Sequence, residues 1–434
     1  MADLRETEPA HGPMVDGMAA ADAPSSPPQG AAESEADTGA DAAPVYEPAG
    51  SAAYAAWQAA NVRPPDAALT VTEYALYTDA QVVGEPPPFG PYRLLHTQAE
   101  RAVARGVPAL YLRVTRDQEI RRIDWENTQA DHYHGGTESD EIAALLSLEA
   151  GMRAAVEDVP ARLFMVPGEP FGRPYAFAPF RHLPQLVDPG PLPRVPAVTG
   201  SREIGGLTRL PRLPELAPGD AIAVVKAARL YQQALWLAET APEFAWLLFV
   251  SAVETAAVHH AGEVSDAERL DAWSPALAER LRATGDEALF AEAARLIAPV
   301  TGATGKFLRF MLRFAPQELP PPRPGPDARV DLGSRKRRER LYSLIYGYRS
   351  AALHAGRPFP APMCAAPAHE DGAIVEVPLG ARARAAGFGT AVWLADDLPI
   401  LLNTFAVLVR GALLAWWDAL LLPAPTPDAA PPGA

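Results

Sequence analysis

The segment that most restricts the fold is residues 242–259, which is hydrophobic on nearly every side of a helix. Pro242 stands at its start, where proline is tolerated because the first helical N–H has no intrahelical partner. A helix without a polar face has to be surrounded by other elements, so we expect it at the centre of a bundle. Glu254 lies within this apolar surface and needs a partner, for which Arg349 or a tyrosine hydroxyl is suitable.

The rest of residues 216–422 also has the periodicity of helices, which predicts an all-α domain. Besides the central segment, the expected helices are 221–239, 276–283, 286–297, 306–314, 338–354 and 395–422. The most apolar run, residues 398–422, is interrupted by Asn403, Arg410 and Asp418. We therefore expect a buried helix there, no membrane span and no membrane partner.

Residues 51–215 predict a smaller α/β domain of unknown role. Strands are expected at 67–77, 108–114, 162–166 and 172–177, helices at 97–105 and 139–153, and a proline-rich connector at 184–214. Ser139 is the expected N-cap of the second helix. His132 and His134 form an H-x-H pair that could hold a metal, with Glu138 as a nearby carboxylate. No third strong ligand stands at a fixed spacing, so we prefer a polar loop without metal or cofactor.

The two ends of the chain, residues 1–50 and 423–434, are expected to be disordered. Residues 1–50 contain ten acidic residues and one arginine, and so contribute −9 to the net charge of −15. This acidic balance excludes nucleic-acid binding through overall charge and leaves only a local basic patch. Cys364 is the single cysteine, so no internal disulfide forms, and without a signal-peptide pattern we expect a cytoplasmic protein. The expected fold class is α+β overall.

The residues that point to chemistry stand at the end of the helix at 338–354, which is expected to stop at Gly356. Arg349, Ser350 and His354 supply a cation, a hydroxyl and an imidazole, which can hold a phosphate and move a proton. Arg349 and His354 are separated by about 140° around the helix axis, so they do not share one face. A two-fold symmetric dimer would bring two copies of this patch together. Cations and histidines in a last helical turn also complement the helix dipole, and the residues alone leave both interpretations open.

A run of basic residues leads into the same helix. Its members are Arg335, Lys336, Arg337, Arg338 and Arg340, and Arg357 follows the helix. They fit contacts to an RNA backbone, although a solvated helix start is an equally good interpretation.

The helical part resembles the HEPN superfamily, and most of all its Apea-like branch. The resemblance is carried by Glu254 in the apolar helix and by the R-x4-H element from Arg349 to His354, with Tyr348 and Ser350 beside the arginine. It implies a helical bundle that forms a homodimer, with metal-independent endoribonuclease activity in stress response or phage defence.

By the same resemblance, Arg349 would steady the scissile phosphate, His354 would act as general acid or base, and Ser350 would orient either, with Glu254 and Tyr348 in support. Some members of the family carry the fold without cleavage. The alternative is therefore an inactive interaction or sensing module that dimerises and binds an unknown partner or ligand, for which the N-terminal domain is available.

Overall fold

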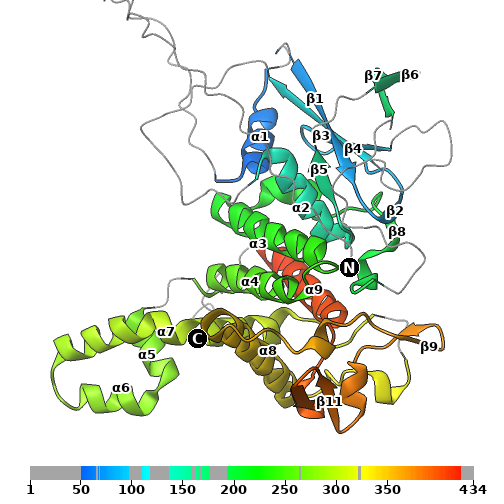
Figure 1. The fold of residues 1–434 in the computed structure, drawn as a ribbon. Coiled ribbons are helices and arrows are strands. Elements are labelled where there is room, and N and C mark those ends of the chain that lie inside the picture. Colours follow the sequence, from blue (N-terminus) through cyan, green and yellow to red (C-terminus); the bar gives the residue numbers. More distant parts are fainter. Residues whose placement is uncertain are drawn as a thin grey trace, which may run out of the picture. The chain divides into compact units, whose positions relative to one another are not determined.

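The computed structural model describes residues 50–64, 67, 69–96, 110–117, 136–157, 162–166, 169–175, 193–262, 265–320 and 324–421. These residues combine helices and strands (Figure 1), so the expected α+β class is confirmed. The predicted tails lie outside the described residues except for Gly50, and so do the predicted helix at 97–105 and both His132 and His134.

The N-terminal part is built on an antiparallel sheet whose strands belong to distant parts of the sequence. Its order is β3 (Tyr92–His96), β4 (Leu110–Asp117), β1 (Leu69–Tyr77) and β5 (Ala155–Glu157). The helices α1 (Ala52–Asn61) and α2 (Glu138–Ala150) contact each other and the sheet. The predicted strands at 67–77 and 108–114 are thus present, whereas α1 and β3 were not predicted.

Helix α2 begins one residue before the predicted start, and its cap is not Ser139. Thr137 is the N-cap, because its side chain accepts from the backbone N–H of Asp140 while the Asp140 carboxylate accepts from that of Thr137. This reciprocal pair satisfies two helix-end donors at once, which a hydroxyl inside the first turn cannot do. The helix ends at Gly151, which adopts the left-handed conformation with φ 67°.

The smaller sheets follow the expected pattern only in part. A hairpin of β6 (Arg162–Val166) and β7 (Glu169–Tyr175) occupies two predicted strands. The predicted connector at 184–214 contains β8 (Gly200–Glu203), which pairs in parallel with β2 (Ala80–Val83).

The helical part is arranged around α4 (Pro242–Ala261), as expected. This helix contacts α3 (Pro218–Leu237), α7 (Glu287–Phe314), α8 (Arg335–Ala355) and α9 (Leu402–Leu421). Trp246 on α4 is stacked with Phe359 and Phe405, whose ring centroids are 5.0 and 4.7 Å away. The helix is not covered on every side, since Phe244 remains 61% exposed.

Helix α7 is a single element where two helices were predicted. It continues through Pro299, Gly302 and Gly305 for 28 residues. Its N-terminal half packs with α5 (Asp266–Trp273) and α6 (Pro275–Arg282) around a small separate cluster that includes Leu270 (Figure 1). Packing at both ends thus holds a helix that local propensity would interrupt.

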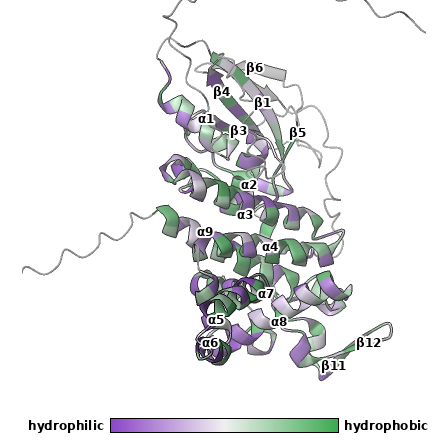
Figure 2. Ribbon diagram, turned by 90° about the vertical axis from the view of Figure 1, so that its left-hand side faces the viewer, coloured by the Kyte–Doolittle hydropathy of each residue, from purple (hydrophilic) through white to green (hydrophobic). Residues whose placement is uncertain are grey.

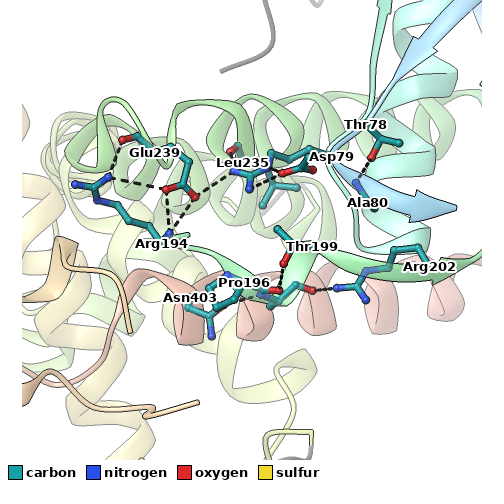
Figure 3. A network of polar contacts seen from close by, with 12 residues as sticks. Thr78, Asp79, Ala80, Arg194, Pro196, Thr199, Arg202, Leu235, Glu239 and Asn403 are labelled. Atoms are coloured by element: carbon teal, nitrogen blue, oxygen red, sulfur yellow. Dashed lines mark hydrogen bonds and ion pairs between the residues drawn. The ribbon is translucent and has the colours of Figure 1, made fainter. Parts of the chain in front are cut away.

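One hydrophobic core extends from Ala53 to Leu421, so the predicted boundary near residue 215 does not separate two cores. A buried ion network crosses the same region (Figure 3). Arg153, only 2% exposed, pairs with Asp79 through Nη2 at 2.8 Å and with Glu239 at 3.3 Å, and donates to the carbonyl of Leu235. Glu239 also accepts from the backbone N–H of Arg194. The network joins the β1–β2 turn to the end of α3, so breaking it would loosen both.

Two of the described helical segments, Pro242–Ala261 and Ala395–Leu421, are long and apolar enough to cross a membrane by length and composition alone. Figure 2 shows the hydrophobic residues along α4 and α9. In the most apolar stretch of each segment, 44% and 67% of the residues are buried within the protein. The polar groups of α9 also bond inside it, since Arg410 donates to Leu148 O at 2.8 Å and Asn403 accepts from Ala197 N–H at 3.0 Å. Packing in the core therefore accounts for much of the apolar character of α9.

Candidate functional site

Helix α8 carries most of the predicted site and ends where the sequence indicates. Gly356 adopts φ 61°, and its N–H and that of Arg357 both bond to the carbonyl of Ala351. One side of the helix is buried and consists of Arg338, Leu341, Tyr342, Ile345 and Tyr346. This side packs towards α4 and α7, so the opposite side of α8 is the one available to a ligand.

Glu254 meets both kinds of partner that its position in an apolar helix predicts. Arg349 Nη2 lies 2.7 Å from Glu254 Oε2, and the Tyr346 hydroxyl donates to Glu254 Oε1 at 2.8 Å. The side chains of Arg349 and Glu254 are 20% and 17% exposed. Burial, and then the bond to Glu254, raise the pKa of Tyr346 to about 12. The charge of Arg349 is thus compensated within the chain.

His354 and Ser350 lie on a different side of α8 from Arg349. His354 is exposed, and Ser350, one turn earlier, is half-buried. Among the described residues, neither side chain has a hydrogen-bond or ionic partner. Because α8 is unbroken, His354 remains about 140° from Arg349 around the axis. A single chain therefore brings Arg349 to Glu254 and not to His354.

A pocket of about 300 Å³ opens on the exposed side of α8. Its lining includes Ser343, Gly347, Tyr348, Ala351, Arg357 and Trp393. Tyr348 is fixed there, because its hydroxyl donates to Asp397 O at 2.6 Å. Burial, followed by the charge of Asp397, raises the pKa of Tyr348 to about 12. Two predicted site residues, Tyr348 and Arg357, thus share one cavity.

The basic run divides into a buried residue and exposed ones. Arg338 is buried and donates to Leu332 O at 2.9 Å, which corrects its predicted contact with RNA. Its hydrocarbon stem and guanidinium complete the inner face of α8, a role that a count of charges does not show.

The exposed members of the basic run mostly form ion pairs. Arg335 pairs with Glu339 and Arg340 with Asp396, both at 2.9 Å, and Arg337 pairs with Asp331. Lys336 and Arg357 are exposed and lack side-chain partners among the described residues. Exposed pairs contribute little stability, so a phosphate can replace their carboxylates at small cost.

Trp393 is the part of this region that sequence reasoning missed. It lies on β12 (Ala391–Leu394), which pairs with β11 (Ala385–Phe388) in a hairpin that was not predicted. The one local signal is Gly389, which adopts φ 60° in the turn between two short apolar runs. A hairpin with so few alternating residues is hard to distinguish from a loop.

No group of three potential metal ligands occurs among the described residues. Glu138 is the one of the three suggested metal ligands that the structure describes, and it has other partners. It accepts from the Tyr92 hydroxyl at 2.7 Å and pairs with Arg116. Its carboxylate therefore already has two partners inside the N-terminal part.

Comparisons with protein-family models, with curated proteins and with solved structures yield no match to this chain. The residues of α8 and the pocket beside it are therefore the basis for any functional assignment.

Proposed function

We propose that the chain is a metal-independent endoribonuclease of the HEPN type, which acts as a cytoplasmic homodimer in stress response or phage defence. In this proposal residues 216–422 form the HEPN-like helical domain, which is not all-α as expected because it includes the β11–β12 hairpin. The observation that carries it is the imidazole of His354, exposed at the end of α8 and free of partners among the described residues. Ser350 lies one turn before it, and Lys336 and Arg340 share its side of the helix.

The chemistry needs little beyond proton transfer, because RNA supplies its own nucleophile. A base takes the proton of the 2′-hydroxyl, the 2′-oxygen bonds to phosphorus, and the bond from phosphorus to the 5′-oxygen breaks as an acid protonates that oxygen. The products are a 2′,3′-cyclic phosphate and a 5′-hydroxyl. The imidazole of His354 supplies either the base or the acid, and water supplies the other.

The proposal constrains the role of Arg349. Its guanidinium uses Nη2 for Glu254, which leaves other donors on the fork for a phosphate. The His354 of the same chain lies on another side of α8. Arg349 can therefore share a phosphate only with the His354 of the second copy. Glu254 and Tyr346 would then hold the guanidinium in place.

The test is cleavage of a single-stranded RNA by the purified full chain in the presence of a chelator. His354→Ala should abolish cleavage while circular dichroism and the melting temperature stay unchanged. His369→Ala is the matched control, because His369 is an exposed histidine on the short strand β9 (His369–Glu370). Mass spectrometry should find the cyclic phosphate. Undiminished cleavage by His354→Ala would falsify the assignment.

The second candidate is a HEPN-fold module that dimerises and binds a partner or ligand without cleavage. The ion pair of Arg349 with Glu254 favours it, since a cation already compensated within the chain is less free to hold a phosphate. This second candidate predicts a dimer that stays intact during size-exclusion chromatography and binds RNA or another ligand. It leaves RNA intact under every condition in which the protein is folded.

A further inference from the structure

The pocket beside α8 has one wall of small residues. Ser343, Gly347 and Ala351 follow each other at intervals of four along α8 and therefore share a side of the helix. An ideal Cβ placed on Gly347 would find no neighbouring atom within 4 Å, so this wall is open. Small side chains here leave room for a flat group to lie against the helix.

Trp393 from β12 lines the same pocket. It is half-buried, and it packs against the hydrophobic core while contributing to the pocket lining. In the hairpin it stands opposite Ala386, so its ring is supported by a fixed strand pair. A supported indole at the wall of a cavity is a stacking platform for a nucleobase.

Charge at the pocket favours an anion. Arg357 lines it with an exposed guanidinium that has no ionic partner among the described residues. The two carboxylates that follow Trp393 in the sequence already have partners. Asp396 pairs with Arg340 at 2.9 Å, and Asp397 accepts from Leu394 N–H at 3.0 Å. A guanidinium at the mouth of an aromatic pocket suits a phosphate joined to a base.

We propose that this α8–β12 pocket binds one unpaired nucleotide of single-stranded RNA, with its base on Trp393 and its phosphate on Arg357. The inference rests on the proposed function and names its substrate class. His354 follows Ala351 by three residues on the same side of α8, so the strand leaving the pocket passes the imidazole. A base inside a duplex cannot enter without unpairing, so the pocket selects single strands.

The experiment measures binding of a fluorescein-labelled oligouridylate octamer to the full chain, in a His354→Ala background that prevents cleavage. Trp393→Leu should weaken binding about 5- to 160-fold, the range for loss of one stacked base. Arg357→Ala should weaken it and lower the slope of log affinity against log salt by about 0.7. The matched controls are Phe388→Leu, an exposed aromatic on the same hairpin, and Arg384→Ala, an exposed cation beside it. Both should bind like the parent.

Three results would overturn the inference: no octamer binding, equal binding by Trp393→Leu, or a preference for a duplex. A fourth is Trp393-dependent binding of uridine monophosphate without binding of the octamer, which would assign the pocket to a free nucleotide. Cleavage by the unmutated chain together with equal binding by Trp393→Leu would remove only this subsite. Trp393-dependent octamer binding without cleavage would keep the subsite and remove the nuclease.

Discussion

Removing the ion pair between Arg349 and Glu254 should destabilise the protein by about 2 kcal/mol. Exposed pairs contribute about 0.2–1 kcal/mol, and breaking a fully buried pair costs about 3–5 kcal/mol. With side chains 20% and 17% exposed, this pair lies between the two classes, and solvent screens part of its interaction. Glu254 also accepts the Tyr346 hydroxyl, so its loss leaves two donors without an acceptor, whereas the loss of Arg349 leaves one carboxylate oxygen.

A double-mutant cycle isolates the interaction. Arg349→Met keeps the hydrocarbon stem, Glu254→Gln keeps an acceptor for Tyr346, and urea unfolding followed by circular dichroism gives each free energy. We expect a coupling energy of about 1–2 kcal/mol between the two substitutions. The matched control is Arg335→Met with Glu339→Gln, an exposed pair on α8 whose coupling should stay below about 0.5 kcal/mol. Additive effects at Arg349 and Glu254 would show that the pair does not hold α8 to α4.

Three further predictions concern other parts of the chain. Burial raises the pKa of the Cys364 thiol from 9.0 to about 12 and that of the Tyr342 hydroxyl from 10.0 to about 12. Between these values the folded protein keeps protons that the unfolded chain releases. The stability that these groups provide is complete below about pH 9 and should be lost towards pH 12, as melting temperature against pH will record. Gly151→Ala should cost about 1–2 kcal/mol in urea unfolding, because φ is 67° and the new Cβ would lie 2.8 Å from Arg410 Nε. Gly219→Ala, in helix α3 where the space is open, should not destabilise the protein. Lys336→Ala should lower the salt slope of RNA binding by about 0.7 without affecting stability, and an unchanged slope would exclude a phosphate contact there.

The parts of the fold that sequence predicts well are those fixed by local chemistry. Pro242 begins α4 and Gly356 ends α8 because each residue favours its backbone position whatever surrounds it. The merging of two predicted helices into α7 depends instead on neighbours at both of its ends. The continuity of the main core has the same origin, since composition changes near residue 215 but packing continues across it.

The candidate site divides in a similar way. A carboxylate in an apolar helix has to find a cation or a hydroxyl, and this rule alone predicts that Glu254 meets Arg349 and a tyrosine. The inward position of Arg338 was missed because a run of cations looks uniform in sequence, although only one of them faces Leu332 O. Trp393 was missed because its hairpin has too few residues to show alternation, and its contact with α8 is a tertiary one.

The geometry of α8 allows one test that separates a site within a chain from a site shared by two. Arg349 points to α4, and His354 lies about 140° away on an unbroken helix, so one chain cannot place both on one phosphate. In a dimer whose sites combine Arg349 of one chain with His354 of the other, two inactive variants should complement each other. Coexpressed Arg349→Met and His354→Ala chains, tagged differently and purified as the mixed dimer, contain one intact combination and should regain about half of the parent's cleavage rate. Each variant alone should remain inactive. A mixed dimer as inactive as its parents would mean that each site takes both residues from one chain, which the direction of Arg349 forbids unless its bond to Glu254 breaks.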